Sequence, residues 1–332
     1  MHTRDLVAAA RDRAIDFLLQ HQSADGRWID WALPPGPSEA WTTAYVALQL
    51  AACSPDQRSR VWPAVMRAAQ WILTHACKTG GWSYNDTVDA DADSTAWSIT
   101  LLRAAGFERG DASDRLACFQ QADGGFATFP ADAGLGSWGR SHPDVTAVAV
   151  NALVDEPSKE RVCQGALQYL RAQRRSDGLW NAFWWTTSLY TTAICLRLLA
   201  RIAPTDDGST TSAALQRMPV GNAFDAALLL ECLVHVQDVA ASRGLSSPAA
   251  EDRIPALLEM LIARQLGDGS WPAAPMLRIT DRTCDAPWRQ PECGPVYADD
   301  RRLFTSATVL RALNAVANTR SGQARALDRA RD

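Results

Sequence analysis

A short recurring phrase constrains the fold of this chain more than any other feature of its sequence. The phrase joins a Gln, an Asp-Gly turn and a large aromatic residue, and a degraded copy ends at Trp82. The closing aromatic residues stand at positions 28, 82, 126, 180 and 271, and the last interval is about twice the others. We therefore expect six units, one of which has lost its phrase near Asp207-Gly208, because a period of this order marks stacked structural repeats.

Each unit joins two kinds of helix. The segments 158–173 and 251–265 predict amphipathic helices that carry charge on one face. The segments that follow the turns are apolar nearly all round, at 95–105, 146–154, 191–200, 226–236 and 305–316. Because a helix of the second kind is buried on every side, we predict an all-α fold, an (α/α)6 toroid of six helical hairpins. It forms one domain over residues 1–332 with a flexible polar tail at 318–332, and the Gln-Trp phrases serve as staples between units.

The starts of the six inner helices should meet at one end of the toroid, since those helices run in parallel. The residues just before each of them would then line one cavity. That rim combines aromatic and acidic side chains: Glu39, Trp41, Thr42 and Thr43, then Asp89, Asp91, Asp93, Ser94 and Thr95, then His142, Asp144 and Thr146, then Phe183, Trp184, Trp185 and Tyr190, then Asp225, and last Asp300, Arg301 and Phe304.

The densest acidic group on this rim is the run Asp89, Asp91 and Asp93 before a predicted helix. In an extended segment, alternate residues point to one side. A helix cap by Asp93 or Ser94 is the simpler interpretation, but three carboxylates are more than a cap needs. Like charges this close cannot all ionise cheaply, so at least one should keep its proton near neutral pH, and perturbed carboxylates in a cavity indicate function.

Four stretches of the chain resemble class II terpene cyclases, a family that includes squalene–hopene cyclases and copalyl diphosphate synthases. Asp91–Ala96 resembles the motif Asp-x-Asp-Asp-Thr-Ala, and the recurring phrase resembles the Gln-Trp repeats. Asp144–Ala147 and Phe183–Thr192 resemble the starts of the next inner helices of squalene–hopene cyclases. The order and spacing agree from about residue 60 to residue 320.

The resemblance implies a protonation-initiated, carbocationic cyclisation of a linear isoprenoid, either a prenyl diphosphate or a prenylated small molecule. It makes Asp93 the general acid, with Asp91 as its supporting carboxylate and Asp89 as the third acid of the cluster. Tyr190 and Asp144 would belong to the network that holds and reloads the proton. The cavity wall would be built by Trp41, Trp97, Trp184, Trp185 and Phe304.

Three departures from the family pattern stand out. Ser94 replaces the third acid of the motif, and Val148 stands where squalene–hopene cyclases carry a His. His142, one turn upstream, could substitute for that His, although a capping or solvent-facing side chain is the simpler expectation. The chain also holds one barrel where the relatives usually have a second helical domain. The cover of the cavity would then be a partner subunit, as in a homodimer, the loop 272–297, or a smaller substrate that needs less cover.

The sequence shows no clear site for a diphosphate with magnesium. Arg140, Arg301 and Arg302 could hold a diphosphate, and Mg²⁺ would be needed only for such a substrate; no other cofactor is predicted. The acidic pairs Asp206-Asp207 and Asp299-Asp300 are expected in solvated turns. Cys284 and Cys293 could pair or bind a metal, but no CxxC spacing occurs, so no metal site is predicted.

Other classes of protein remain open or are excluded. A net charge of −4 without a basic stripe excludes a nucleic-acid partner. Without a leader or a span, we expect a cytoplasmic protein with at most peripheral membrane contact. Three alternatives remain. The first is a non-catalytic barrel that binds an isoprenoid or a partner protein, and the second is a glycosidase that uses two of the rim acids. The third is a relative of the prenyltransferase β-subunit, but its zinc site needs a late His, and no His follows His235.

Overall fold

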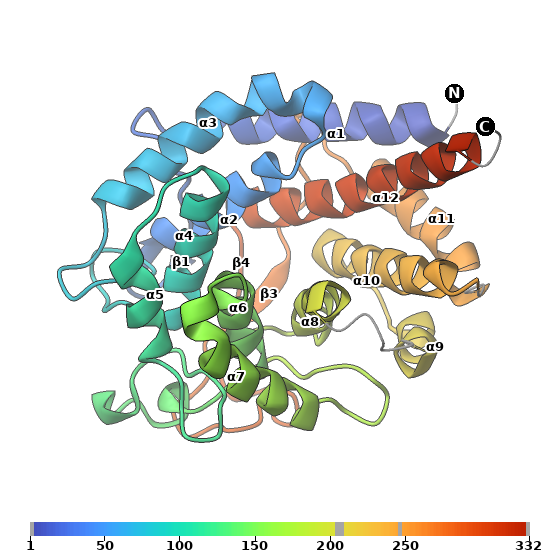
Figure 1. Ribbon diagram of the computed structural model, residues 1–332. Helices are drawn as coiled ribbons and strands as arrows, with labels where there is room; N and C mark the ends of the chain where they lie inside the picture. The colour runs from blue at the N-terminus through green and yellow to red at the C-terminus, as the bar shows by residue number, and fades with distance from the viewer. Residues whose placement is uncertain (1–2, 203–208, 245–247, 330–332) are drawn as a thin grey trace.

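The inner helices of the described chain form a closed ring (Figure 1). The structure is a computed structural model that describes residues 3–202, 209–244 and 248–329. Each inner helix contacts the next around the ring, and the last contacts the first. In order they are α2 (Ala40–Ala51), α4 (Ala92–Ala104), α6 (Pro143–Leu153), α8 (Leu189–Ile202), α10 (Ala223–Ser242) and α12 (Leu303–Arg329).

Six outer helices alternate with the inner ones along the chain and cover them. They are α1 (Thr3–Gln20), α3 (Pro55–Thr74), α5 (Gly110–Ala117), α7 (Glu160–Ala172), α9 (Ser209–Arg217) and α11 (Pro248–Ala263). The predicted all-α toroid of helical hairpins is confirmed. The physical reason is visible in the burial pattern, because α6 is buried at every position except Asn151 whereas α7 buries only one face.

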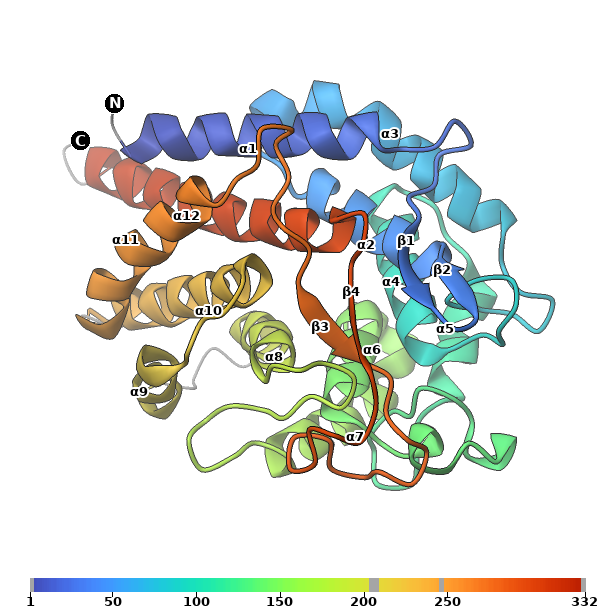
Figure 2. The same cartoon turned by 180° about the vertical axis from the view of Figure 1, so that it is seen from behind.

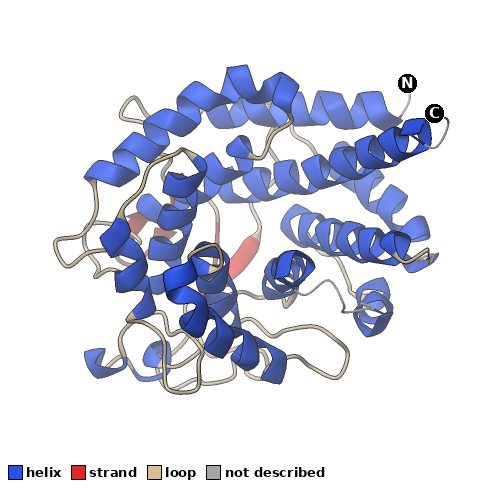
Figure 3. Ribbon diagram, in the orientation of Figure 1, coloured by secondary structure: helices blue, strands red, loops and turns tan. Residues whose placement is uncertain are grey.

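Two antiparallel hairpins were not predicted as strands (Figures 2 and 3). The first pairs β1 (Asp30–Leu33) with β2 (Gly36–Ser38), and the second pairs β3 (Pro275–Arg278) with β4 (Val296–Ala298). Both precede an inner helix, α2 and α12 respectively, so they lie at the end of the ring where those helices begin. Three short 3₁₀ helices complete the described structure, at Ala131–Ala133, Gly136–Gly139 and Pro157–Lys159.

The recurring turns join neighbouring units through repeated hydrogen bonds. Gln22 donates from its amide to the Ala64 carbonyl of the next outer helix at 2.8 Å, and Gln120 does the same to Val162 at 2.8 Å. Glycine is required inside the turn, because a Cβ at Gly124 (φ +87°) would lie 2.5 Å from the Gly165 carbonyl oxygen. The closing tryptophan anchors each turn to its own outer helix by donating its indole N–H, from Trp28 to Leu18, Trp82 to Ile72, Trp180 to Leu170 and Trp271 to Leu261.

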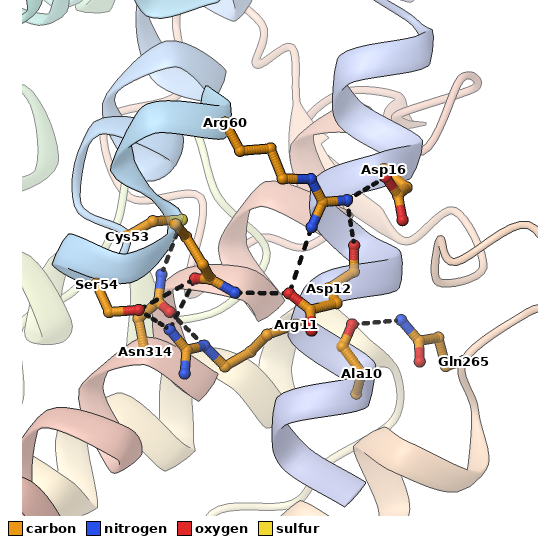
Figure 4. Close-up of polar contacts among 10 residues, drawn as sticks. Ala10, Arg11, Asp12, Asp16, Cys53, Ser54, Arg60, Gln265 and Asn314 are labelled. Atoms are coloured by element: carbon orange, nitrogen blue, oxygen red, sulfur yellow. Dashed lines mark hydrogen bonds and ion pairs between the residues drawn. The ribbon is translucent and has the colours of Figure 1, made fainter. Parts of the chain in front are cut away.

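The same device closes the ring between its two ends (Figure 4). The Gln265 amide donates to the Ala10 carbonyl of α1 at 2.9 Å. Arg11 then donates to Asn314 of α12 at 2.7 Å and to Ser54 at 2.9 Å. The first and last hairpins are therefore bonded as neighbouring hairpins are elsewhere.

Some predictions about the fold fall outside these observations. The lost phrase near Asp207-Gly208 lies outside the described residues, and so do residues 330–332 of the predicted tail. α12 extends to Arg329, through most of the segment 318–332. Within the described ranges, no helix combines the length and the apolar character that crossing a membrane requires.

Candidate active site

A cavity of about 530 Å³ opens where the inner helices begin. Its walls are mostly apolar, and three carboxyl groups face it, from Asp91, Asp93 and Asp144. The first hairpin contributes Leu33, and the segment 272–297 contributes three further side chains. The cavity is therefore built from part of the predicted rim together with the two hairpin segments.

The second residue of every inner helix belongs to one layer at the base of this cavity. Counting from the first residue of each helix, as in α4 from Ala92 to Asp93, the six residues are Trp41, Asp93, Asp144, Tyr190, Phe224 and Phe304. The four aromatic members pack together, with ring centroids 5.0 Å apart for Trp41–Phe304, 6.2 Å for Phe224–Phe304 and 6.5 Å for Tyr190–Phe224. Two adjacent helices, α4 and α6, thus supply carboxyl groups to an otherwise aromatic layer.

Asp91 caps α4. It has extended backbone angles (φ −119°, ψ 159°), and its Oδ1 accepts a hydrogen bond from the Ser94 N–H at 2.7 Å. The simpler interpretation of the acidic run, a cap by Asp93 or Ser94, does not hold, because Asp91 is the cap residue. Asp91 is 4% exposed, and burial raises its pKa to about 6.

Asp93 lines the cavity without taking part in the cap. Burial raises its pKa well above the usual value, and the negative charges of Asp91 and Asp144 raise it further. The indole N–H groups of Trp41 and Trp97 oppose this and lower the pKa, although neither reaches hydrogen-bond geometry. Burial and the two neighbouring charges therefore favour the protonated form of Asp93.

Asp144 links α6 to the segment before α8. Its Oδ2 accepts from the backbone N–H groups of Phe183 and Trp184, each at 2.9 Å, while its Oδ1 has no hydrogen-bond partner. Burial raises the pKa of Asp144 to about 6. The two backbone donors hold this carboxyl in place beside the cavity.

Some aromatic residues line the cavity and others support those residues from behind. Trp41, Trp184 and Trp185 line the cavity. Trp185 stacks on Tyr190 at 3.8 Å, and Tyr190 is buried with no partner for its hydroxyl group. Phe304 is fully buried and is not a lining residue, so Tyr190 and Phe304 support the wall from behind.

Three predicted site residues lie elsewhere. Asp89 is exposed and lies outside the cavity. The run had been expected to alternate, with Asp89 and Asp91 on one side, but the adjacent residues Ala90 and Asp91 are both buried, so the alternation fails. His142 does not face solvent: it is 4% exposed, its ring stacks on Phe183 at 3.6 Å, and burial lowers its pKa to about 3. Trp97 lines a second chamber instead of this cavity.

Several lining residues escaped the sequence analysis. Thr128 accepts a hydrogen bond from the Trp184 indole at 2.8 Å, and Trp138 packs edge-on against Trp184 at 5.2 Å. Arg282 is the only cationic side chain among the described lining residues, and its guanidinium lies 5.1 Å from the Trp138 ring. These three residues leave no periodic signal in the sequence because they lie outside the α-helices. The remaining ones are Leu33, Pro34, Pro35, Tyr84, Val88, Phe129, Val145, Leu277 and Ile279.

The predicted acidic turns and phosphate ligands also need correction. Asp299 is fully buried and accepts hydrogen bonds from the Ala274 and Thr305 N–H groups. Its burial, and to a lesser extent the negative charge of Asp30, raise its pKa to about 8. Arg140, Arg301 and Arg302 do not line the cavity, and the pair Asp206-Asp207 lies outside the described residues. In the described part of the chain, no three His, Cys, Asp or Glu side chains gather as a metal site would need, and Cys284 and Cys293 are free thiols.

Comparison with known proteins relates the chain to terpene cyclases. The type II terpene cyclase MstE from Scytonema, solved with geranylgeranyl dihydroxybenzoate as substrate, superposes with a TM-score of 0.84 at 25% identity over 96% of this chain and 99% of that one. The chain is a single-barrel relative of the class II terpene cyclases. The same barrel thus accounts for nearly all of the MstE chain.

Two further terpene cyclases match parts of the chain. Drimenyl diphosphate synthase from Streptantibioticus cattleyicolor is 32% identical over 131 residues, which are 37% of this chain and 23% of that protein. The ent-copalyl diphosphate synthase from Streptomyces platensis shares the fold, with a TM-score of 0.60 at 18% identity over 83% of this chain and 50% of that one. No protein-family model matches the chain.

Proposed function

We propose that this chain is a class II terpene cyclase in which Asp93 protonates a carbon–carbon double bond of a linear isoprenoid. One observation carries the proposal: a carboxyl group with a strongly raised pKa lines an apolar cavity between two other buried carboxyls. An alkene is a very weak base, so its protonation needs an acid that is still protonated at neutral pH and is held against the double bond.

The proton transfer can be followed atom by atom. The Asp93 O–H gives its proton to one alkene carbon, whose π electrons form the new C–H bond and leave a carbocation on the other carbon. The carboxylate left on Asp93 lies in the first turn of α4, where the helix dipole favours negative charge. Neighbouring double bonds then attack the cation in turn, and loss of a proton ends the sequence, so the product is an isomer of the substrate. In this proposal the proton returns to Asp93 by way of Asp144, whose charge acts on Asp93, and Tyr190, which belongs to the same layer.

The aromatic wall stabilises the travelling positive charge. The faces of Trp41, Trp184 and Trp185 attract a cation, by about 2 kcal/mol or more each when water is excluded. Indole rings also offer no ready nucleophile that would trap the cation early. The wall therefore favours cyclisation over premature quenching.

The substrate class follows from the one cationic side chain of the cavity. MstE was solved with a geranylgeranyl group attached to dihydroxybenzoate. In this chain, Arg282 beside Trp138 offers a charge and an aromatic face to an acidic head group. We propose a prenylated aromatic acid or a prenyl diphosphate as substrate, the latter with Mg²⁺.

Product analysis tests the proposal. Purified protein is incubated with geranyl, farnesyl and geranylgeranyl diphosphates, prenylated hydroxybenzoates, the free alcohols and squalene, with and without Mg²⁺. Mass spectrometry should find a cyclised isomer of one substrate. Asp93→Asn should lower its formation by about 10²–10⁴-fold, the usual contribution of a general acid. Asp89→Asn is the matched control, because that exposed carboxyl should change the rate little.

One observation favours a second candidate, a non-catalytic barrel that binds an isoprenoid. Ser94 stands in place of the third motif acid, and its N–H group is committed to the Asp91 cap. Tight binding of a prenyl ligand without turnover, equal in wild type and Asp93→Asn, would support this candidate and exclude the cyclase.

A further inference from the structure

A second chamber, of about 690 Å³, lies at the opposite end of the inner ring. The ninth residue of every inner helix lines it, as Arg311 does in α12, which begins at Leu303. In ring order these residues are Leu48, Thr100, Asn151, Arg197, Glu231 and Arg311. Trp97 separates the two spaces, because it lines this chamber while its indole N–H acts on the Asp93 carboxyl.

The charges in this layer are not balanced. The Glu231 carboxylate, whose side chain is 4% exposed, receives hydrogen bonds from both Arg197 and Arg311. Two guanidinium groups therefore share one carboxylate, which leaves one positive charge in a largely buried cluster. A buried charge without a counterion is costly.

Other ionisable groups of the chamber do not correct the imbalance. Arg201 pairs with Asp155 at 2.8 Å and so adds no net charge. Burial lowers the pKa of His235, which favours its neutral form. Asp238 lines the chamber but is exposed to solvent. The excess positive charge stays on the Arg197–Arg311 side.

Arg311 also lacks partners for its outer edge. Its Nε atom donates to Glu231 at 2.9 Å, but Nη1 and Nη2 make no hydrogen bond with the described residues and are closed to water. The two Nη atoms form the edge of the guanidinium that binds carboxylate or phosphate through two parallel N–H donors. Arg197, whose side chain is 25% exposed, stands on the accessible side of the cluster and gives an entering anion its first contact.

We propose that this chamber is a second binding site, separate from the cyclisation cavity, for a small oxyanion that carries a carboxylate or phosphate group. The anion first contacts Arg197, completes the charge balance of the Arg197–Glu231–Arg311 cluster, and accepts the unpaired N–H groups of Arg311 once that side chain turns toward the chamber. Its binding is independent of the chemistry at Asp93.

Binding of simple anions tests this site. The midpoint of thermal unfolding and the heat of binding are measured with inorganic phosphate and with acetate, against sodium chloride at equal ionic strength. A ligand of the folded state stabilises it, so we expect at least one of the two anions to raise the midpoint above the chloride value. Which anion binds more tightly distinguishes a phosphate site from a carboxylate site.

Three variants locate the site. Arg311→Lys keeps the charge but removes the paired donors, so we expect about tenfold weaker binding. Arg197→Lys, which leaves the Arg311–Glu231 bond in place, should also weaken binding and serves if Arg311→Lys does not fold. Arg60→Gln is the matched control and should change affinity less than about twofold, because Arg60 is paired with Asp12 and does not line the chamber.

Two results would overturn the proposal. One is that neither phosphate nor acetate stabilises the wild type more than chloride does. The other is that Arg60→Gln weakens binding as much as the Arg311 and Arg197 variants. Asp93→Asn should bind the anion as the wild type does, so loss of cyclisation and loss of anion binding are told apart.

Discussion

Replacement of Trp184 by Leu tests whether the aromatic wall contributes to the proposed reaction. The Trp184 ring is fixed on three sides: its N–H donates to Thr128 at 2.8 Å, and its ring meets Trp138 at 5.2 Å and Phe183 at 5.0 Å. It also lines the cavity that holds Asp93. A ring held in this way needs no further ordering when a substrate binds, which is what stabilising a short-lived cation requires.

The size of the effect follows from these contacts. A desolvated cation–π interaction is worth about 2 kcal/mol, and about 1.4 kcal/mol corresponds to a factor of ten in rate. Trp184→Leu should therefore lower kcat/KM by roughly 30-fold. Thr128→Val removes only the hydrogen bond that orients the ring, worth about 0.5–1.5 kcal/mol, and should lower kcat/KM by roughly two- to tenfold.

The assay is initial-rate product formation together with the distribution of products. Trp184→Leu should raise the share of partly cyclised products, and Trp184→Phe should recover part of the rate because it keeps an aromatic face. Trp288→Leu is the control, since Trp288 is 41% exposed and does not line the cavity. A Trp184→Leu enzyme within about threefold of the wild type, with unchanged products, would refute the idea that this ring stabilises the cation.

Two further predictions concern the acid and the ring closure. Since the proposed reaction needs a proton on Asp93, kcat/KM should fall as pH rises through the pKa of Asp93. Asp144→Asn removes a negative charge that raises this pKa, so the fall should move to lower pH. An unchanged pH profile would contradict the influence of Asp144 on Asp93. Gly269→Ala places a Cβ 2.3 Å from the Arg13 carbonyl oxygen, whereas Gly106→Ala, also at positive φ, meets nothing within 4 Å. Urea unfolding should show that Gly106→Ala lowers the free energy of unfolding by about 1–2 kcal/mol and that Gly269→Ala lowers it clearly more. Equal losses would contradict the close packing of the first hairpin against the last.

The helices could be predicted from the sequence because their burial has a period. The apolar run 146–154 corresponds to α6, Pro143–Leu153, with boundaries that differ by three residues or fewer. The hairpins could not be predicted in this way. Their strands have three or four residues, and the register of each hairpin is irregular, so no alternation develops.

The site was predictable where it coincides with the starts of inner helices. Trp41, Asp93 and Asp144 are second residues of such helices, and so is Phe224, which the sequence analysis passed over in favour of its neighbour Asp225. Aligning the six helix starts would have found it. Thr128 and Arg282 lie in irregular segments, and only tertiary packing brings them to the cavity.

Errors arose where burial was inferred from local polarity. Asp299 and His142 have polar neighbours in the sequence, yet each is buried and bonded to backbone groups, Asp299 to the Thr305 N–H at 2.6 Å and His142 to the Ser137 carbonyl at 2.8 Å. A buried polar group with such partners is no less stable than a solvated one, so sequence alone does not separate the two cases.

The division of work between Asp91 and Asp93 explains how an acid at a helix start can keep its proton. A carboxylate that accepts backbone N–H groups is stabilised in its charged form and becomes a poor general acid. In α4 that task falls to Asp91, which takes the Ser94 N–H, while backbone donors are absent from the main influences on the Asp93 pKa. The occupied cap thus leaves burial and the neighbouring charges to favour a protonated Asp93, which still lies within the first turn, where the helix dipole lowers the cost of a negative charge.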